Sequence, residues 1–164
     1  MYKRQLGDHT ETIQVDYDPS VITYKDLLDA FWNGHDPGRK SWTRQYMSMI
    51  LYHDPDQEKE ARESKAALEK RTGRKVHTVI EPYSRFYLAE NYHQKYRLKM
   101  ESGIMSDLGR YYPDSSDLPH STAAARINGF LYGYGDPDFF EEISGQLGLS
   151  DKSLDRIRRA LAGR

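Results

Sequence analysis

A carboxylate near the start of the chain stands among apolar residues with the spacing of a β-strand. From His9 the sequence alternates, and one set of alternate positions holds Glu11, Ile13, Val15 and Tyr17. Alternate side chains of a strand share one face, so we expect Glu11 on the apolar face. A carboxyl group there loses hydration, which favours its protonated form and makes it a proton donor near neutral pH. The alternative, which the periodicity alone favours, is that Glu11 lies at a frayed strand end and reaches solvent.

Two further groups of polar side chains are candidates for chemistry. Tyr46 opens an apolar segment after a polar loop, where functional hydroxyl groups often lie, although a core tyrosine is the plainer interpretation. Residues 92–96 gather Tyr92, His93 and other hydrogen-bonding side chains within about one helical turn. Glu90 and His93 have the spacing of some carboxylate–histidine metal sites, but the sequence holds no second such pair, so we expect no bound metal.

Composition and charge exclude several classes of protein. Lys and Arg number 24 and Asp and Glu 25, for a net charge of −1, so nothing indicates a nucleic-acid partner. The apolar runs are too short to span a bilayer and no signal peptide is recognisable, so we expect a cytoplasmic protein without a membrane partner. Cysteine is absent, which excludes disulfides, cysteine metal sites and any reaction that needs a thiolate of this chain.

Strands and helices alternate in the first 100 residues, which is typical of an α/β or α+β fold. We expect strands at residues 9–17, 46–53, 76–81 and 86–88, and helices at residues 24–33, 55–71 and 91–99. Thr23 and Asp54 are expected to cap the first two helices. The second strand is apolar on both faces, which favours a central position in the sheet. The second helix is rich in charge and is expected to cover the sheet with the face that carries Ala61 and Leu68.

The final part of the chain changes in character. Residues 101–119 are rich in Ser and Asp and are expected to form a loop. Three helices are expected after it, at residues 121–132, 136–146 and 150–161. We therefore predict one domain at residues 1–100 and a helical C-terminal extension at residues 101–164.

Four segments of the chain form a specific combination. They read Gly-Asp-His-Thr-Glu-Thr-Ile-Gln-Val-Asp-Tyr-Asp-Pro at 7–19, Leu-Leu through Phe-Trp to His-Asp-Pro at 27–37, Arg-Gln-Tyr-Met-Ser at 44–48, and Phe-Tyr through Ala-Glu to Tyr-His-Gln at 86–94. Together, in this order and spacing, they resemble the methionine sulfoxide reductase A family over about residues 7–100. The resemblance implies a two-layer sandwich, with helices on one side of a mixed sheet, built on a ferredoxin-like reductase core.

The resemblance also implies a chemistry. In that family a thiolate attacks the sulfur of methionine sulfoxide, a glutamic acid protonates the departing oxygen, and tyrosine hydroxyls hold that oxygen. On this basis Glu11 corresponds to the proton donor and Tyr46 to one of the oxygen-holding tyrosines, while Tyr92 and His93 lie beside the substrate pocket. The implied substrates are oxidised proteins or peptides that carry methionine sulfoxide. No bound cofactor is implied, and the external reductant is thioredoxin or another thiol.

Departures from the family pattern leave several interpretations open. The family's Gly-Cys-Phe-Trp segment, upstream of the glutamate, does not occur in this sequence, and Ser41 replaces a family Asp. We expect an N-terminally truncated reductase that lacks the nucleophile and the first strand and helix, and that is inactive alone. One alternative is a non-catalytic domain that binds methionine sulfoxide or a partner protein. Another is that the helical extension is an interaction module and the functional part.

Overall fold

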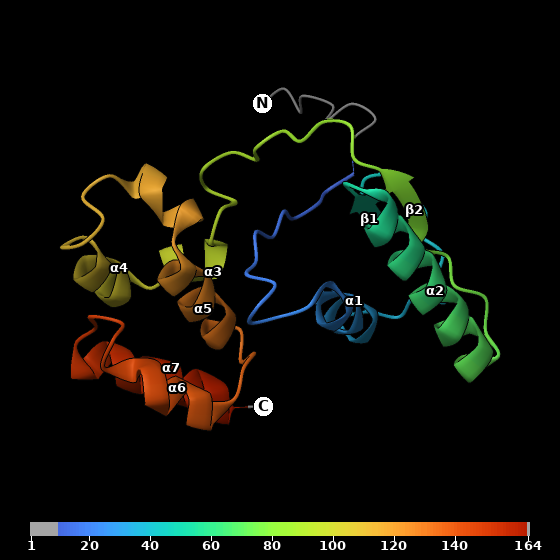
Figure 1. The fold of residues 1–164 in the computed structure, drawn as a ribbon. Helices are drawn as coiled ribbons and strands as arrows, with labels where there is room; N and C mark the ends of the chain where they lie inside the picture. The colour runs from blue at the N-terminus through green and yellow to red at the C-terminus, as the bar shows by residue number, and fades with distance from the viewer. Residues whose placement is uncertain (1–9, 164) are drawn as a thin grey trace. The chain divides into compact units, whose positions relative to one another are not determined.

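The computed structural model describes residues 10–163 and has a mixed fold of helices and strands, as the sequence predicts (Figure 1). Among these residues it contains seven α-helices, one 3-10 helix and a sheet of two parallel strands. The chain divides into two compact units, residues 1–86 and 87–164. Each unit has a hydrophobic core of its own, and each is described by itself.

Helix α1 (Tyr24–Asn33) begins and ends as its sequence predicts. Thr23 caps its N-terminus, because the Thr23 hydroxyl accepts from the Asp26 N–H at 3.2 Å and the Asp26 carboxylate accepts from the Thr23 N–H at 2.9 Å. This reciprocal pair satisfies N–H groups that have no partner within the helix. Leu28 and Trp32, one turn apart, are buried on its inner face.

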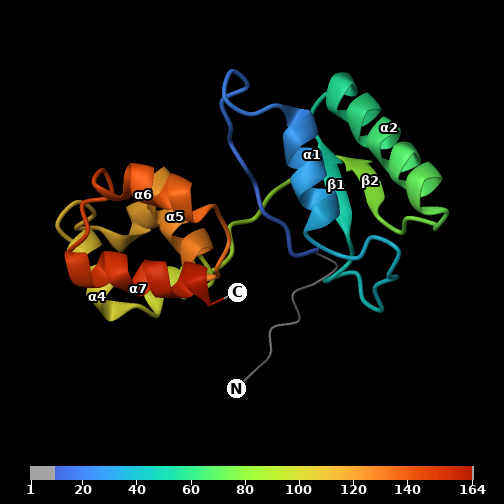
Figure 2. The same ribbon diagram turned by 90° about the horizontal axis from the view of Figure 1, so that it is seen from below.

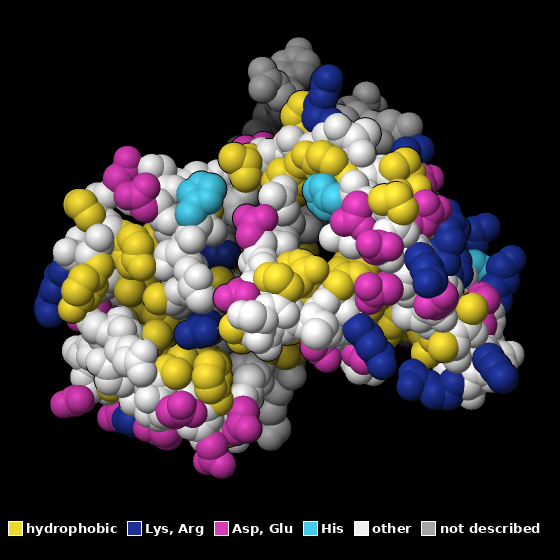
Figure 3. All heavy atoms as spheres, in the orientation of Figure 1, with side chains coloured by type: hydrophobic (Ala, Val, Ile, Leu, Met, Phe, Trp, Pro, Cys, Tyr) yellow, Lys and Arg dark blue, Asp and Glu magenta, His cyan; other side chains and the backbone are white. Residues whose placement is uncertain are grey.

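Helix α2 (Pro55–Thr72) packs on the sheet, which confirms its predicted role. Asp54 caps it by accepting a backbone N–H of the first turn at 2.8 Å, and Gly73 ends it with a left-handed φ of 65°. Ala61 and Leu68 are buried on the face toward the sheet. Lys, Arg, Asp and Glu side chains are mixed over the outer face of this helix (Figure 3).

The sheet of the first unit joins strand β1 (Met49–Tyr52) to strand β2 (Val79–Pro82), with α2 as the connection. Ile50 and Ile80 are paired in register, and both belong to the core that α1 and α2 share. The Trp32 indole N–H, within this core, donates to the Ser64 hydroxyl at 3.0 Å. Both helices lie beside the strands in Figure 2. The core thus fixes the start of β1, which follows Tyr46.

The expected first and fourth strands are wrong over the described residues. Residues 10–17 and 86–88 are not strands, and the sheet is a parallel pair rather than a mixed sheet. The start of the expected first strand, His9, lies outside the described residues. A strand requires a continuous row of hydrogen bonds to a neighbour, and residues 10–17 make backbone bonds to another segment only near Glu11. Ile13 is consequently 87% exposed and Val15 51%.

The second unit is helical. Its helices are α3 (Tyr96–Lys99), α4 (Ser102–Leu108), the 3-10 helix η1 (Ser115–His120), α5 (Thr122–Leu131), α6 (Pro137–Ser144) and α7 (Asp151–Ala162). The last three confirm the expected helices, while the expected loop at 101–119 instead contains α4 and η1. The expected helix at 91–99 is also wrong in its first half. Lys95 has a left-handed φ of 52°, so residues before it form a turn and only α3 is helical.

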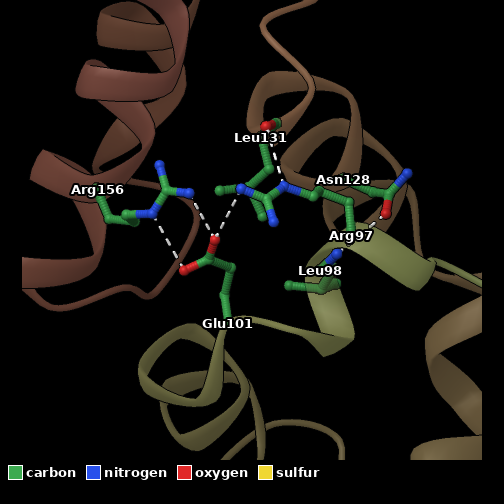
Figure 4. Close-up of polar contacts among 6 residues, drawn as sticks. All are labelled: Arg97, Leu98, Glu101, Asn128, Leu131 and Arg156. Carbon is green, nitrogen blue, oxygen red and sulfur yellow. Dashed lines mark hydrogen bonds and ion pairs between the residues drawn. The ribbon is translucent and has the colours of Figure 1, made fainter.

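One ion-pair network ties the first two helices of this unit to its last. The Glu101 carboxylate accepts from the Arg156 guanidinium through two hydrogen bonds, of 2.6 and 3.1 Å (Figure 4). A nitrogen of Arg97 lies 3.3 Å from the same carboxylate. The Leu98 N–H donates to the Asn128 side chain at 3.1 Å, which joins α3 to α5. The bidentate geometry fixes the direction as well as the distance of the contact.

The domain boundary predicted at residue 100 concerns the family domain and stays a prediction.

Candidate functional site

Glu11 is held against the residue that precedes Tyr46. The Glu11 N–H donates to the Gln45 carbonyl at 2.9 Å, and the Gln45 side-chain amide donates to the Glu11 carboxylate at 2.7 Å. The Thr10 hydroxyl extends this contact by donating to the Arg44 carbonyl at 3.0 Å. These bonds bring together two segments that are 34 residues apart in the sequence. Glu11 and Tyr46, which sequence reasoning singled out separately, are therefore neighbours in the fold.

The expected position of Glu11 on a buried apolar face is wrong. Glu11 is exposed, and its expected neighbours Ile13 and Val15 are exposed as well. The alternative, in which Glu11 reaches solvent, is the arrangement observed. Strand alternation assigns a buried face only where the strand is covered, and Glu11, Ile13 and Val15 are all exposed here. Tyr46 is 65% exposed, so it is not the core tyrosine of the plainer interpretation.

A chain of hydrogen bonds anchors the segment that follows Tyr46. The His35 Nδ1 lies 2.8 Å from the Phe31 carbonyl, which can only accept, so this nitrogen carries the proton. In the neutral imidazole, Nε2 then accepts from the Ser48 hydroxyl at 2.8 Å. Ser48 in turn accepts from the hydroxyl of Thr78, which is 1% exposed, at 2.8 Å. Through these hydrogen bonds, His35 of the His-Asp-Pro segment connects the end of α1 to the residues that precede β1 and β2.

The loop before Tyr46 closes on itself. The Ser41 hydroxyl donates to the Thr43 carbonyl at 2.8 Å and accepts from the Thr43 N–H at 3.3 Å. Ser41, which stands at the position of a family Asp, therefore supports its own turn. Beside this turn Trp42 is 96% exposed. The sequence patterns gave Trp42 no role. The signal that could have identified it is a tryptophan within a polar loop, four residues before Tyr46.

Tyr92 and His93 lie in the second unit, within the turn at residues 91–95. Their rings are 4.1 Å apart between centroids, and both side chains are exposed. The Lys99 ammonium holds the turn by donating to the carbonyl and, at 2.7 Å, to the side-chain oxygen of Asn91. Burial lowers the pKa of Lys99. The structure thus gathers Glu11 and Tyr46 in one unit and Tyr92 and His93 in the other.

Glu90 and His93, the pair with the spacing of a metal site, have no third metal-ligating side chain beside them among the described residues. His93 Nε2 lies 4.0 Å from the Glu90 carboxylate, and residues 10–163 contain no group of three or more metal-ligating side chains. No helix in the described part of the chain is long and apolar enough to cross a membrane.

Comparison with known proteins identifies the family. A family model described as peptide methionine sulfoxide reductase matches residues 2–110. The chain belongs to the peptide methionine sulfoxide reductase family. A peptide methionine sulfoxide reductase of Drosophila melanogaster is 42% identical over 149 residues, which cover 90% of this chain and 59% of the relative. The MsrA of Methanoculleus marisnigri is 42% identical over 102 residues, or 58% of this chain and 62% of the relative.

The resemblance found in the four sequence segments is thereby confirmed, since the family match includes all of them. The similarity also reaches into the second unit. Peptide methionine sulfoxide reductase A5 of Oryza sativa subsp. japonica is 33% identical over 150 residues, which cover 88% of this chain and 58% of the relative. Part of the helical region after residue 110 is therefore matched in some members of the peptide methionine sulfoxide reductase family. The chain spans about three fifths of the length of these curated relatives.

Proposed function

We propose that this chain forms part of a peptide-methionine (S)-S-oxide reductase, which reduces methionine sulfoxide in oxidised proteins to methionine. The observation that carries the proposal is the hydrogen bond of 2.7 Å between Gln45 and the Glu11 carboxylate. It holds a potential proton donor next to Tyr46, within a chain whose family performs this reaction. Both side chains are exposed and accessible to a protein substrate.

In the proposed reaction a thiolate sulfur attacks the sulfoxide sulfur of the substrate. The sulfoxide oxygen takes a proton from Glu11, which is a general acid here, and the Tyr46 hydroxyl donates a hydrogen bond to the same oxygen. The sulfur–oxygen bond to the substrate breaks, methionine leaves, and the oxygen ends on the attacking sulfur as a sulfenic acid. From the family resemblance we infer that Tyr92 and His93 also contact the substrate. The 164 residues contain no cysteine, so the thiolate comes from outside this sequence.

Further parts of the proposal follow from the family. We infer a cytoplasmic enzyme whose sulfenic acid is reduced by thioredoxin or another thiol, with no bound cofactor. We also infer the ferredoxin-like, two-layer arrangement of helices on a mixed sheet for the complete reductase domain. In such an arrangement the exposed apolar side chains of residues 10–17 would be covered by further structure.

The test supplies the thiolate. The N-terminal segment of a curated relative that contains Gly-Cys-Phe-Trp is joined to the chain, and reduction of an acetylated methionine sulfoxide amide is followed with dithiothreitol as reductant. We expect methionine to form with the extended chain, and not with the original chain or with an extension in which serine replaces the cysteine. An inactive extended chain that still binds the sulfoxide would favour the non-catalytic binding domain instead.

A further inference from the structure

A pocket lies in the loop that precedes Tyr46. It is formed by residues 41–44 together with Met47, Met49 and Glu81, and it encloses about 260 Å³. We call it the Trp42 pocket. Ligand sites for cofactors and drug-sized molecules usually enclose about 300–1,000 Å³. The Trp42 pocket is therefore the size of a subsite for a part of a ligand, such as one side chain.

The lining of the Trp42 pocket combines apolar and polar side chains and has no net charge. The Trp42 ring and the Met47 and Met49 side chains provide its apolar surface, and methionine adapts readily to ligands of different shape. One cation, Arg44, and one anion, Glu81, complete it, so neither sign of charge on a ligand is favoured. With no net charge and three large apolar side chains in its lining, the pocket fits an uncharged apolar side chain better than a charged one.

Residues that line the Trp42 pocket directly flank the candidate site in the sequence. Gln45, which binds Glu11, follows Arg44 directly, and Met47 follows Tyr46 directly. The Met47 N–H donates to the Arg44 carbonyl at 3.3 Å, so the loop folds back and holds both ends of the pocket together. An extended peptide advances by about 3.3 Å per residue. If its methionine sulfoxide lies at Glu11 and Tyr46, the side chains one or two residues away in the peptide are the ones that can reach the Trp42 pocket.

We propose that the Trp42 pocket binds an apolar side chain that flanks the oxidised methionine in a peptide substrate. This rests on the proposed function and adds to it a preference for sites with a large apolar residue next to the methionine. Trp42 is 96% exposed in the free protein and offers an aromatic surface that becomes covered when such a side chain binds.

The chain reports on the Trp42 pocket through its own fluorescence. It has two tryptophans, of which Trp32 is 6% exposed in the core and Trp42 is in the pocket. The unextended chain is titrated with two acetylated tripeptide amides, Leu-methionine sulfoxide-Leu and Ala-methionine sulfoxide-Ala. We expect the Leu peptide to shift Trp42 emission to shorter wavelength and to bind about tenfold more tightly than the Ala peptide. In a Trp42→Phe control, which keeps only Trp32, the emission shift disappears.

Calorimetric titration of Trp42→Ala completes the test, since this substitution of an exposed side chain leaves the fold intact. The Leu peptide should bind about tenfold more weakly to Trp42→Ala, while the affinity of the Ala peptide stays within about twofold. Any of three results would overturn the inference. These are an equal loss of affinity for both peptides in Trp42→Ala, an unchanged Trp42 emission, and no binding of either peptide. The proposed function is decided separately, by reduction of an acetylated methionine sulfoxide amide, which has no flanking side chain.

Discussion

Glu11 is held beside Tyr46, although it lacks the burial that its sequence pattern suggests. Its carboxylate is bound by Gln45 and its backbone by the same residue. The sequence could identify Glu11 and Tyr46 through the family resemblance, and the structure explains their proximity. It could not reveal that Glu11 is exposed, because burial depends on what covers residues 10–17 and not on their alternation.

Replacement of Glu11 tests its role as the proton donor. In the extended, cysteine-containing chain, Glu11→Gln should lower the rate of sulfoxide reduction by roughly 10²–10⁴, the range typical of a general acid. Tyr46→Phe should lower it less, because the family resemblance implies a second tyrosine that holds the same oxygen. The matched control is Glu63→Gln, an exposed glutamate of α2, which should leave the rate unchanged. Near-full activity of Glu11→Gln in steady-state assays would refute the assignment.

Helix caps account for most of the elements that the sequence predicted correctly. Thr23, Asp54 and Asp136 each accept a backbone N–H at the start of a helix at the expected place. Helix α4 has no such side-chain cap, and it was missed within a segment that reads as a loop. Its Ile104 and Leu108 are buried in the core of the second unit, so tertiary packing stabilises a helix that local sequence does not predict.

Asp107, at the end of α4, links that helix to the start of α7. Its buried carboxylate accepts from the Ser150 N–H at 2.9 Å, the Ser150 hydroxyl at 2.7 Å and the Ser153 hydroxyl at 2.6 Å. These hydrogen bonds, with that of Ser153 the strongest, lower the pKa of Asp107 from 3.8 to about 2. They favour the ionised carboxylate in the folded state over the unfolded state.

The lowered pKa of Asp107 predicts how stability depends on pH. The stabilisation should be complete above about pH 4 and should be lost as the pH falls from 3.8 toward 2, because the folded state then takes up a proton less readily than the unfolded state. Asp107→Asn should lower the melting temperature of the second unit at neutral pH and flatten its dependence on pH in this window. Circular dichroism melts between pH 2 and 7 measure both effects. An unchanged pH profile in Asp107→Asn would contradict this assignment.

At the scale of the whole molecule, two separate cores predict two unfolding events. The core of the first unit includes Leu68 and that of the second includes Ile127, and the two cores share no buried residue. Residues 83–90, between them, form no helix or strand. Calorimetry should therefore resolve two transitions, and limited proteolysis should cut first in this segment.

Core substitutions assign the two transitions. Leu68→Ala should destabilise only the first unit and Ile127→Ala only the second, each by about 2–5 kcal/mol. Each variant serves as the control for the other. A single transition that both substitutions lower together would show that the units unfold as one.

We propose that this chain supplies the acid and the substrate site of a reductase for one sulfoxide epimer. The most direct measurement is a single turnover of the extended chain, with its added cysteine, on the separated S and R epimers of an acetylated methionine sulfoxide amide. We expect about one methionine per chain to form from the S epimer and none from the R epimer. Equal yields from both epimers, or no methionine from either, would contradict it.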